Sequence, residues 1–439
     1  MLKKDLKTYH EVLLKKIKNS RAIISIIGLG YVGLPLSINF IKHKFNVIGI
    51  DNDKKKINLL KKGKSYISNI SNKEIKNIKF FDLSNEYSVI KKADIIVFCL
   101  PTPITKNKSP DLSFINNALN ELKKYIKPGQ AFSLESTSYP GTTEDLFIPL
   151  IKELKLTPGK DCFIIYSPER EDPGNLHYSL KNTVKVFSGL TQNCKKIASA
   201  FYSVGNNKTH KVSNIKTAEM TKLLENIYRA VNIGLINELK LLADSLEIDI
   251  YEIIKAASTK PFGFKAFYPG PGLGGHCIPI DPFYLSWKAK EYDINLKFIE
   301  LAGEINSSMP NHILSKITNY LNSICKSIKN SKILILGLSY KKNIDDLRES
   351  PSLKIIDLLL NSGAFVKYSD PFFSELPKLR SFDFEIDSIE INAINLKGFD
   401  CVILCTDHDN FDYDLIKNHS RFILDTRGRF KVQKNIQRG

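Results

Sequence analysis

The stretch RAIISIIGLGYVGLPLSINFIKHKFNVIGID, residues 21–51, decides the fold of the first part of this chain. A run of β-branched apolar residues ends at Gly28, a helical stretch follows, and a second apolar run ends at Asp51. Strand, glycine turn, helix and strand in this order are typical of a parallel, doubly wound sheet. The sequence therefore predicts an α/β fold from its first fifty residues.

The glycines of this stretch form a GxGxxG pattern that predicts a dinucleotide site. Gly28 allows the tight turn, Gly30 lets the backbone approach a pyrophosphate, and Gly33 allows close packing of helix on strand. A carboxylate at Asp51 would bind a ribose 2′-hydroxyl and repel a 2′-phosphate, which favours NAD over NADP. Lys56 either adds a contact near the adenosine or is an ordinary surface lysine. The predicted cofactor contacts in this half of the chain are Gly28, Gly30, Tyr31, Val32, Gly33, Asp51, Lys56, Thr102 and Thr137.

The same alternation of strands and helices continues and then recurs. Further strands are expected at 93–103, 130–137, 162–169 and 183–189, a long helix at 214–246, and a second strand–turn–helix series after Ser331. We expect two Rossmann-like, doubly wound parallel sheets joined by a region with a long central helix. The expected parts are an N-terminal arm with a short amphipathic helix (1–20), an NAD-binding domain (21–212), a central helical region (213–310) and a nucleotide-sugar domain (311–439). The helix of the arm is expected to carry its apolar residues on one side, namely Leu2, Leu6, Val12, Leu13 and Ile17.

Composition limits the class of protein. The chain has 439 residues, of which 43% are hydrophobic and 25% charged, as in ordinary globular proteins. No apolar run reaches the roughly 18 residues that span a bilayer, and the Lys-rich start lacks the apolar core of a signal peptide. We expect a cytoplasmic protein without a membrane partner. The net charge of +18 comes from lysines that are scattered along the chain. This scatter favours an ordinary charged surface, then attraction of anionic small molecules, and a nucleic-acid partner least.

Seven cysteines without a CxxC pair argue against a disulfide framework and against a metal site. Only Cys277 lies among glycines, in GPGLGGHCIPID, residues 270–281. Such an irregular loop lets a substrate carbon approach a reactive thiol closely. Asp281 is placed to orient a water or a lysine, whereas His276 is more often a packing residue than a base.

Polar residues elsewhere are weaker candidates when each is taken alone. Lys222 and Asn226 are four residues apart on the long helix and share a face, although spacing alone favours a solvated lysine. Glu169, in SPEREDPG, and Thr137, in ESTSYPGTT, lie at the ends of predicted strands, beyond which ligands bind in open α/β sheets. Each of these two would otherwise be a turn residue.

Together the motifs resemble those of the UDP-glucose/GDP-mannose dehydrogenases. The resemblance rests on GLGYVGLPL, EMTKLLENIYRAVNIGLINE, GPGLGGHCIPID and GLSYKKNIDDLRESPSL, in order, and covers about residue 22 to residue 429. It implies oxidation of a nucleotide sugar at C6 from alcohol to carboxylate, with two NAD reduced per turnover. The cysteine loop would then retain the intermediate aldehyde.

The resemblance also implies roles for the candidate residues. Cys277 would form a thiohemiacetal and then a thioester, and Lys222 with Asn226 would stabilise the developing oxyanion. Glu169 would serve acid–base steps, Asp281 would hold a water or proton-transfer partner, and Thr137 would position that water. Arg348 would reach toward the cofactor. Either Arg427 or Arg429 would be the arginine that a neighbouring subunit contributes, and the motifs do not distinguish between the two. The implied substrate contacts are Glu169, Arg170, Lys222, Asn226, Phe267, Tyr268, Gly274 and Lys341.

Within the family, the strings SPEREDPGN and TDHDNFDYDLI are most like UDP-N-acetylglucosamine 6-dehydrogenases that feed O-antigen synthesis in bacteria. UDP-N-acetylmannosamine, UDP-N-acetylgalactosamine and UDP-glucose remain alternative substrates. A hydroxyacid or 6-phosphogluconate-type dehydrogenase would need neither the cysteine loop nor the second α/β unit, and a polyanion-binding protein would use only the charge. The family pattern also implies a homodimer or larger homo-oligomer built on the long helix.

Overall fold

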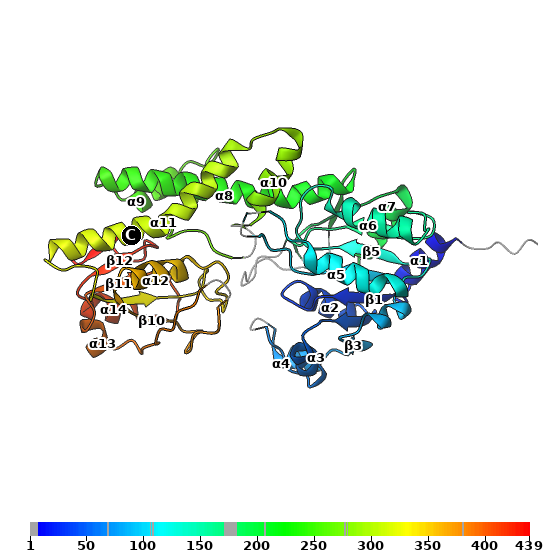
Figure 1. Ribbon diagram of the computed structural model, residues 1–439, viewed down its shortest axis with the longest axis horizontal. Helices are drawn as coiled ribbons and strands as arrows, with labels where there is room; N and C mark the ends of the chain where they lie inside the picture. Colours follow the sequence, from blue (N-terminus) through cyan, green and yellow to red (C-terminus); the bar gives the residue numbers. More distant parts are fainter. Residues whose placement is uncertain are drawn as a thin grey trace, which may run out of the picture. The chain divides into compact units, whose positions relative to one another are not determined.

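The computed structural model describes residues 8–67, 70–105, 107, 109–170, 182–205, 208–275, 278, 280–379 and 382–439. The chain divides into two compact units (Figure 1). The first comprises Met1–Glu225 and Phe283–Ile294, and the second comprises Asn226–Pro282 and Asn295–Gly439. Each unit holds its own sheet, so the predicted fold class of two doubly wound α/β units is confirmed.

The sheet of the first unit has the strand order β3-β2-β1-β4-β5-β6-β7-β8. All neighbouring pairs are parallel except β6 and β7, which run antiparallel. The strands are β1 (Ile23–Ile27), β2 (Asn46–Ile50), β3 (Asp82–Ser84), β4 (Ile95–Phe98), β5 (Ala131–Leu134), β6 (Phe163–Tyr166), β7 (Lys185–Gly189) and β8 (Thr209–Lys211).

Helices accompany this sheet along the chain because each parallel pair needs a crossover. They are α1 (Tyr9–Lys18), α2 (Gly33–Lys42), α3 (Lys54–Lys61), α4 (Asn72–Lys76), α5 (Ser113–Leu122), α6 (Thr142–Glu153), α7 (Gln192–Tyr202), α10 (Asp281–Ala289) and the short η1 (Tyr87–Lys92), η2 (Lys123–Tyr125) and η3 (Lys290–Tyr292). The long helix α8 (Ile215–Ser245) follows β8.

Apolar side chains of the central strands alternate between two separate cores. Ile26 and Val97 belong to one core, and their neighbours Ile27 and Phe98 belong to the other. Burial on both faces explains why these strands are continuously apolar in the sequence. The predicted N-terminal helix is present as α1, where Leu13 and Ile17 are buried, but Val12 is exposed and not on the apolar side. Leu2 and Leu6 lie outside the described residues.

The second unit contains a parallel sheet with the strand order β10-β9-β11-β12-β13. Its strands are β9 (Lys332–Leu336), β10 (Phe365–Ser369), β11 (Cys401–Leu404), β12 (Ile423–Asp425) and β13 (Ile436–Arg438). Its helices are α9 (Ile250–Ala257), α11 (Lys297–Ser323), α12 (Pro351–Asn361), α13 (Ala393–Lys397) and α14 (Tyr413–His419). Within the described ranges, no helix is long and apolar enough to cross a membrane.

Candidate active site

The glycine turn after β1 has the geometry that a dinucleotide needs. Gly28 has a φ of 91°, and a Cβ there would lie 2.5 Å from the carbonyl oxygen of Cys99. At Gly33, the first residue of α2, a Cβ would collide with the carbonyl oxygen of Gly28. Gly30, by contrast, has no atom within 4 Å of the place of a Cβ. The backbone at Gly30 is therefore open to a ligand, as close approach to a pyrophosphate requires.

Asp51 lies directly after β2 and is hydrogen-bonded to the glycine turn. Its Oδ2 accepts from the Leu29 N–H at 2.9 Å, and its Oδ1 accepts from the Asp53 N–H at 3.0 Å. Lys56 donates to Asp51 Oδ2 at 3.2 Å, so it is paired with the predicted ribose-binding acid. The Tyr66 hydroxyl donates to the Leu29 carbonyl, a contact that the sequence did not reveal. The turn, the open backbone and the acid together fit NAD.

Two predicted cofactor contacts, Thr102 and Thr137, meet beyond the carboxyl ends of β4 and β5. The Thr102 hydroxyl donates to the Thr137 carbonyl at 2.8 Å. The Tyr284 hydroxyl, from α10, donates to the Thr102 carbonyl at 2.6 Å. Tyr31 and Val32 precede α2, with Val32 at its N-cap. Tyr284 was missed because nothing in its local sequence links it to residues that precede it by more than 180 positions.

Glu169 lies after β6 in a buried cluster of charges. The Lys185 ammonium lies 2.9 Å from Glu169 Oε2 and 2.7 Å from Glu135 Oε2. The Arg170 N–H donates to Glu169 Oε1 at 2.6 Å. Burial alone would raise the pKa of Glu169, but Lys185, with a smaller contribution from Lys222, holds that pKa below its usual value. Glu169 is therefore a fixed, ionised carboxylate.

Burial acts differently on the other two members of the cluster. It holds the pKa of Glu135 above its ordinary value, even with Lys185 nearby. Burial would lower the pKa of Lys185, yet the two carboxylates raise it overall. Neither residue was predicted from the sequence, because Lys185 lies in a largely apolar strand and Glu135 begins ESTSYPGTT, the motif in which only Thr137 was singled out.

Two further predicted substrate residues of the first unit, Arg170 and Lys222, are not freely solvated. The Arg170 guanidinium is held by Glu225, with NH2 2.6 Å from Oε1 and Nε 3.1 Å from Oε2. Lys222 on α8 is 9% exposed. Lys222 is thus not the solvated lysine that its spacing alone favoured.

In the second unit, Asn226 and Asp281 lie together. The Asn226 amide donates to Asp281 Oδ2 at 2.5 Å, and Asp281, the first residue of α10, is 1% exposed. The loop before Asp281 begins at Gly270, whose N–H donates to the Asn237 side chain at 3.1 Å. Cys277 and its neighbour His276 lie outside the described residues.

The glycines of this loop are needed where it approaches the loop between β9 and α12. A Cβ on Gly274 would collide with Tyr340, and a Cβ on Gly275 would lie 2.9 Å from the same ring. The Gly275 N–H donates to the Arg348 carbonyl at 2.9 Å. The predicted substrate residue Gly274 therefore lies beside the loop that carries Lys341 and Arg348.

The remaining predicted residues of the second unit have local partners. The Arg348 guanidinium forms three hydrogen bonds to Asp346, with Nε 2.9 Å from Oδ1 and 3.0 Å from Oδ2, and NH2 2.5 Å from Oδ2. The Phe267 ring packs edge-on against Tyr228, and the exposed Tyr268 ring stacks on Tyr251.

The two arginines near the C-terminus are distinguished by their contacts. Arg427 donates to the Cys405 carbonyl at 2.6 Å, and its NH1 would lie 3.0 Å from a Cβ at Gly270. Arg429 lies over the Tyr413 ring instead. Of these two arginines, Arg427 is therefore the one beside the glycine loop.

A glycine turn that fits NAD, a buried acidic cluster and a second nucleotide-type sheet define an NAD-dependent α/β oxidoreductase. Three profiles of the UDP-glucose/GDP-mannose dehydrogenase family match the chain: the NAD binding domain at 22–205, the central domain at 216–308 and the UDP binding domain at 334–432. The chain belongs to this family. It is an NAD-dependent nucleotide-sugar dehydrogenase.

Individual relatives support the family assignment. Protein CapL of Staphylococcus aureus is 35% identical over 92% of this chain and 95% of its own length. UDP-N-acetyl-D-mannosamine dehydrogenase of Methanocaldococcus jannaschii is 33% identical, covering 92% of both chains. UDP-N-acetyl-D-glucosamine 6-dehydrogenase of Salmonella typhi is 32% identical over 88% of this chain and 90% of its own. The solved UDP-D-ManNAc dehydrogenase of Pyrococcus horikoshii superposes with a TM-score of 0.84 at 29% identity, over 94% and 96% of the two chains.

Proposed function

We propose that this chain oxidises a UDP-N-acetylhexosamine at C6 from alcohol to carboxylate, reducing two NAD per sugar, in bacterial surface polysaccharide (O-antigen) synthesis. The observation that carries the proposal is the hydrogen bond from the half-buried Asn226 to the buried Asp281 at the end of the glycine loop. It supplies an acceptor for a water or proton beside the loop of Cys277. Among the relatives named above are a UDP-N-acetyl-D-mannosamine dehydrogenase and a UDP-N-acetyl-D-glucosamine 6-dehydrogenase, and the sequence strings favour the second sugar.

NAD held at the glycine turn would supply the oxidant for two two-electron steps, from the C6 alcohol to the aldehyde and from the thiohemiacetal to the thioester. The Cys277 thiolate adds to the aldehyde carbon and forms a thiohemiacetal, whose oxidation leaves a thioester. Water then hydrolyses the thioester, releasing the carboxylate and restoring the thiol. Lys222 and Asn226 stabilise the oxyanion that develops on the substrate oxygen.

The carboxylates and Thr137 complete the proposed proton transfers. Glu169 takes and returns protons, because Lys185 keeps its carboxylate ionised. Asp281 and Thr137 position the hydrolytic water. We place the reaction in the cytoplasm, where the chain's scattered cysteines, Cys277 among them, stay reduced.

The test is the number of NADH formed per sugar consumed. Purified protein is given NAD with UDP-N-acetylglucosamine, UDP-N-acetylmannosamine, UDP-N-acetylgalactosamine or UDP-glucose. We expect two NADH per molecule of an N-acetylated sugar, no turnover by Cys277→Ser, and normal turnover by Cys325→Ser, in which an exposed cysteine is replaced. One NADH per sugar, or an active Cys277→Ser variant, would refute the thioester route. Turnover of UDP-glucose alone would refute the proposed sugar class.

We also propose that α8 forms the interface of a homodimer. Its second-unit part and the residue that follows it expose apolar side chains at helical spacing, and the first turns of α11 expose two more. These residues are Tyr228, Leu235, Leu239, Leu242, Leu246, Phe298 and Leu301. A stripe at positions 228, 235, 242 and 239, 246 follows the seven-residue spacing with which helices pair. Light scattering should give twice the chain mass, and Leu239→Glu with Leu242→Glu should give the monomer; an unchanged mass would refute this interface.

A further inference from the structure

The second sheet repeats the strand arrangement of the cofactor sheet. The order β2-β1-β4-β5-β6 in the first unit corresponds to β10-β9-β11-β12-β13 in the second. The glycine turns also correspond. Gly28 has a φ of 91° and donates its N–H to the Ile50 carbonyl at 2.8 Å, and Gly337 has a φ of 83° and donates to the Ser369 carbonyl at 2.9 Å.

The acid that ends the neighbouring strand is repeated as well. Asp51, after β2, accepts from the Leu29 N–H at 2.9 Å. Asp370, after β10, accepts from the Leu338 N–H at 2.6 Å. Each of the two acids also accepts from the N–H two residues further along its own chain segment. The second sheet therefore retains the turn and the acid of a dinucleotide site.

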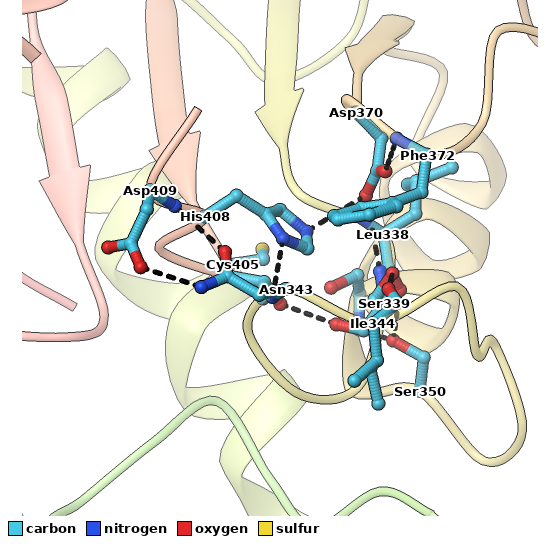
Figure 2. A network of polar contacts seen from close by, with 12 residues as sticks. Leu338, Ser339, Asn343, Ile344, Ser350, Asp370, Phe372, Cys405, His408 and Asp409 are labelled. Atoms are coloured by element: carbon cyan, nitrogen blue, oxygen red, sulfur yellow. Dashed lines mark hydrogen bonds and ion pairs between the residues drawn. The ribbon is translucent and has the colours of Figure 1, made fainter. Parts of the chain in front are cut away.

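The two sheets differ at the third residue after the cysteine that follows the next strand. Thr102 is the third residue after Cys99, which follows β4, and His408 is the third residue after Cys405, which follows β11. His408 is fully buried, and its Nε2 lies 3.2 Å from Asp370 Oδ2 (Figure 2). The imidazole thus reaches from the end of β11 to the end of β10, across the switch point at β9 where such sheets bind ligands.

The other imidazole nitrogen holds the loop between β9 and α12, residues 337–350. His408 Nδ1 accepts from the Asn343 N–H at 3.0 Å, which places the ring proton on Nε2. Asn343 has a φ of 61° and is also bonded through its side chain to Asp409, in both directions, at 2.6 and 3.0 Å (Figure 2). The tip of the loop is therefore fixed at three hydrogen bonds.

This loop replaces the short connection that precedes the helix in the cofactor sheet. In the first unit only residues 28–32 separate β1 from α2, so the helix N-terminus meets the glycine turn. In the second unit the longer loop lies between the turn and α12 in the sequence, although Ser350, the N-cap of α12, still donates to the Leu338 carbonyl at 2.6 Å. This loop carries Lys341, the proposed contact to the uridine diphosphate. The same loop contacts the glycine loop through Tyr340 and the Arg348 carbonyl.

We propose that His408 is a positioning residue for the substrate's nucleotide. The second sheet uses its dinucleotide-type acid to orient His408, and His408 in turn holds the Lys341 loop in its binding conformation. The fixed loop spares the substrate the entropy of ordering it, which increases affinity. This inference rests on the proposed role of Lys341 and on the match of residues 334–432 to the family's UDP binding domain.

The test compares three variants by calorimetric titration with UDP and, separately, with NAD. His408→Leu keeps the volume and loses both hydrogen bonds, whereas His408→Gln retains a donor and an acceptor. Ile335→Val, in the buried core of β9, weakens the same sheet without touching the loop. Hydrogen exchange of residues 339–348 reports the state of the loop, and circular dichroism confirms that each variant is folded.

We expect His408→Leu to raise the Kd of UDP by about tenfold or more and the Kd of NAD by less than about twofold. Exchange in the 339–348 segment should rise in parallel. His408→Gln should recover most of the affinity, and Ile335→Val should change neither quantity. A folded His408→Leu variant with unchanged UDP affinity, or an equal loss in Ile335→Val, would overturn the proposal. The titration uses UDP, which carries no sugar. If the proposed sugar is wrong, the turnover assay shows it, and the result of this titration is unaffected.

Discussion

The Lys185 ammonium lies 2.9 Å from the Glu169 carboxylate, and less than a tenth of either side chain is exposed. Glu135 approaches the same ammonium from the end of β5 at 2.7 Å. One buried cation therefore serves two buried carboxylates. Such a group is sensitive to the loss of a partner, because an unpaired buried charge is costly even where the intact pair adds little net stability.

Lys185→Met should destabilise the protein and impair catalysis. It leaves Glu135 and Glu169 buried without their cation, so we expect a loss of about 3–5 kcal/mol in the free energy of unfolding at pH 7. The pKa of Glu169, which Lys185 lowers, should rise, and the acid limb of the pH–rate profile should move to higher pH.

Urea unfolding and the pH dependence of kcat/KM measure both effects of Lys185→Met. Lys185→Arg is the control, since it keeps the charge and should retain most of the stability. The difference in unfolding free energy between wild type and Lys185→Met should shrink as the pH falls through the folded-state pKa of Glu169. A carboxyl whose pKa is lowered in the folded state stabilises the protein only while it is ionised, that is, above that pKa. A Met variant as stable as wild type would contradict the role of the cluster.

Glu219→Gln tests a second buried carboxyl, which holds the N-terminus of α6. Glu219 accepts from the Gly141 N–H at 2.5 Å and from the Thr143 N–H at 2.9 Å. Burial raises the pKa of Glu219 to about 7, although these hydrogen bonds oppose the shift. In Glu219→Gln the side-chain NH2 faces the N–H of either Gly141 or Thr143. We expect this to lower the free energy of unfolding by about 1–3 kcal/mol at pH 5.

The cost of Glu219→Gln should become smaller as the pH rises from about 4.5 to 7. With a raised folded-state pKa, the wild-type carboxyl binds its proton more tightly when folded, so its contribution is full at low pH and is lost toward pH 7. Urea unfolding at pH 5 and pH 8 measures the difference. Glu238→Gln, at an exposed position of α8, the helix that also carries Glu219, should show no such trend. A cost that grows with pH would contradict the direction of the shift.

Asp51→Asn should weaken the preference for NAD over NADP. The substitution keeps the size of the side chain but removes the charge that would repel a 2′-phosphate. We expect the ratio of kcat/KM for NAD to that for NADP to fall by about tenfold or more, which is about 1.4 kcal/mol. Asp53→Asn, which retains the N-cap of α3, should leave the ratio unchanged. An unaltered ratio in Asp51→Asn would show that another group excludes the phosphate.

Much of the fold was predictable because its signals are local. The glycine turn, the apolar strands and the uninterrupted α8 each follow from short stretches of sequence. The antiparallel direction of β7 was not predictable, because the pairing of Ile165 with Gly189 depends on how the intervening segment returns to the sheet. Val12 was placed on the wrong side of α1, because helical spacing alone did not fix which face would be buried.

The candidate site was only partly predictable, because its polar partners come from distant segments. Lys185 follows Glu135 by fifty residues, and in the sequence it is one lysine in an apolar strand. His408 lies in a string that was noted for the sugar, not for contact with Asp370. Side chains that act on one another across neighbouring strand ends carry no common periodic signal, so only the folded sheet reveals them.

Asp281→Asn should reduce kcat with little change in the KM for the sugar. Asp281 is buried and accepts from the Asn226 amide at 2.5 Å, so the substitution keeps its shape while placing an NH2 where a carboxylate oxygen accepts. If Asp281 holds the water or proton-transfer partner, its loss should lower kcat by about 100-fold or more.

Asp293→Asn is the matched control for Asp281→Asn. Asp293 is exposed and has a φ of 56°, a conformation that asparagine adopts readily, so the same chemical change there should leave kcat unaltered. Steady-state kinetics on both variants, with thermal unfolding to verify that each is folded, measure the effect. A folded Asp281→Asn variant that retains kcat within about threefold of wild type would remove Asp281 from the proton-transfer steps and leave the Asn226 pair with a structural role.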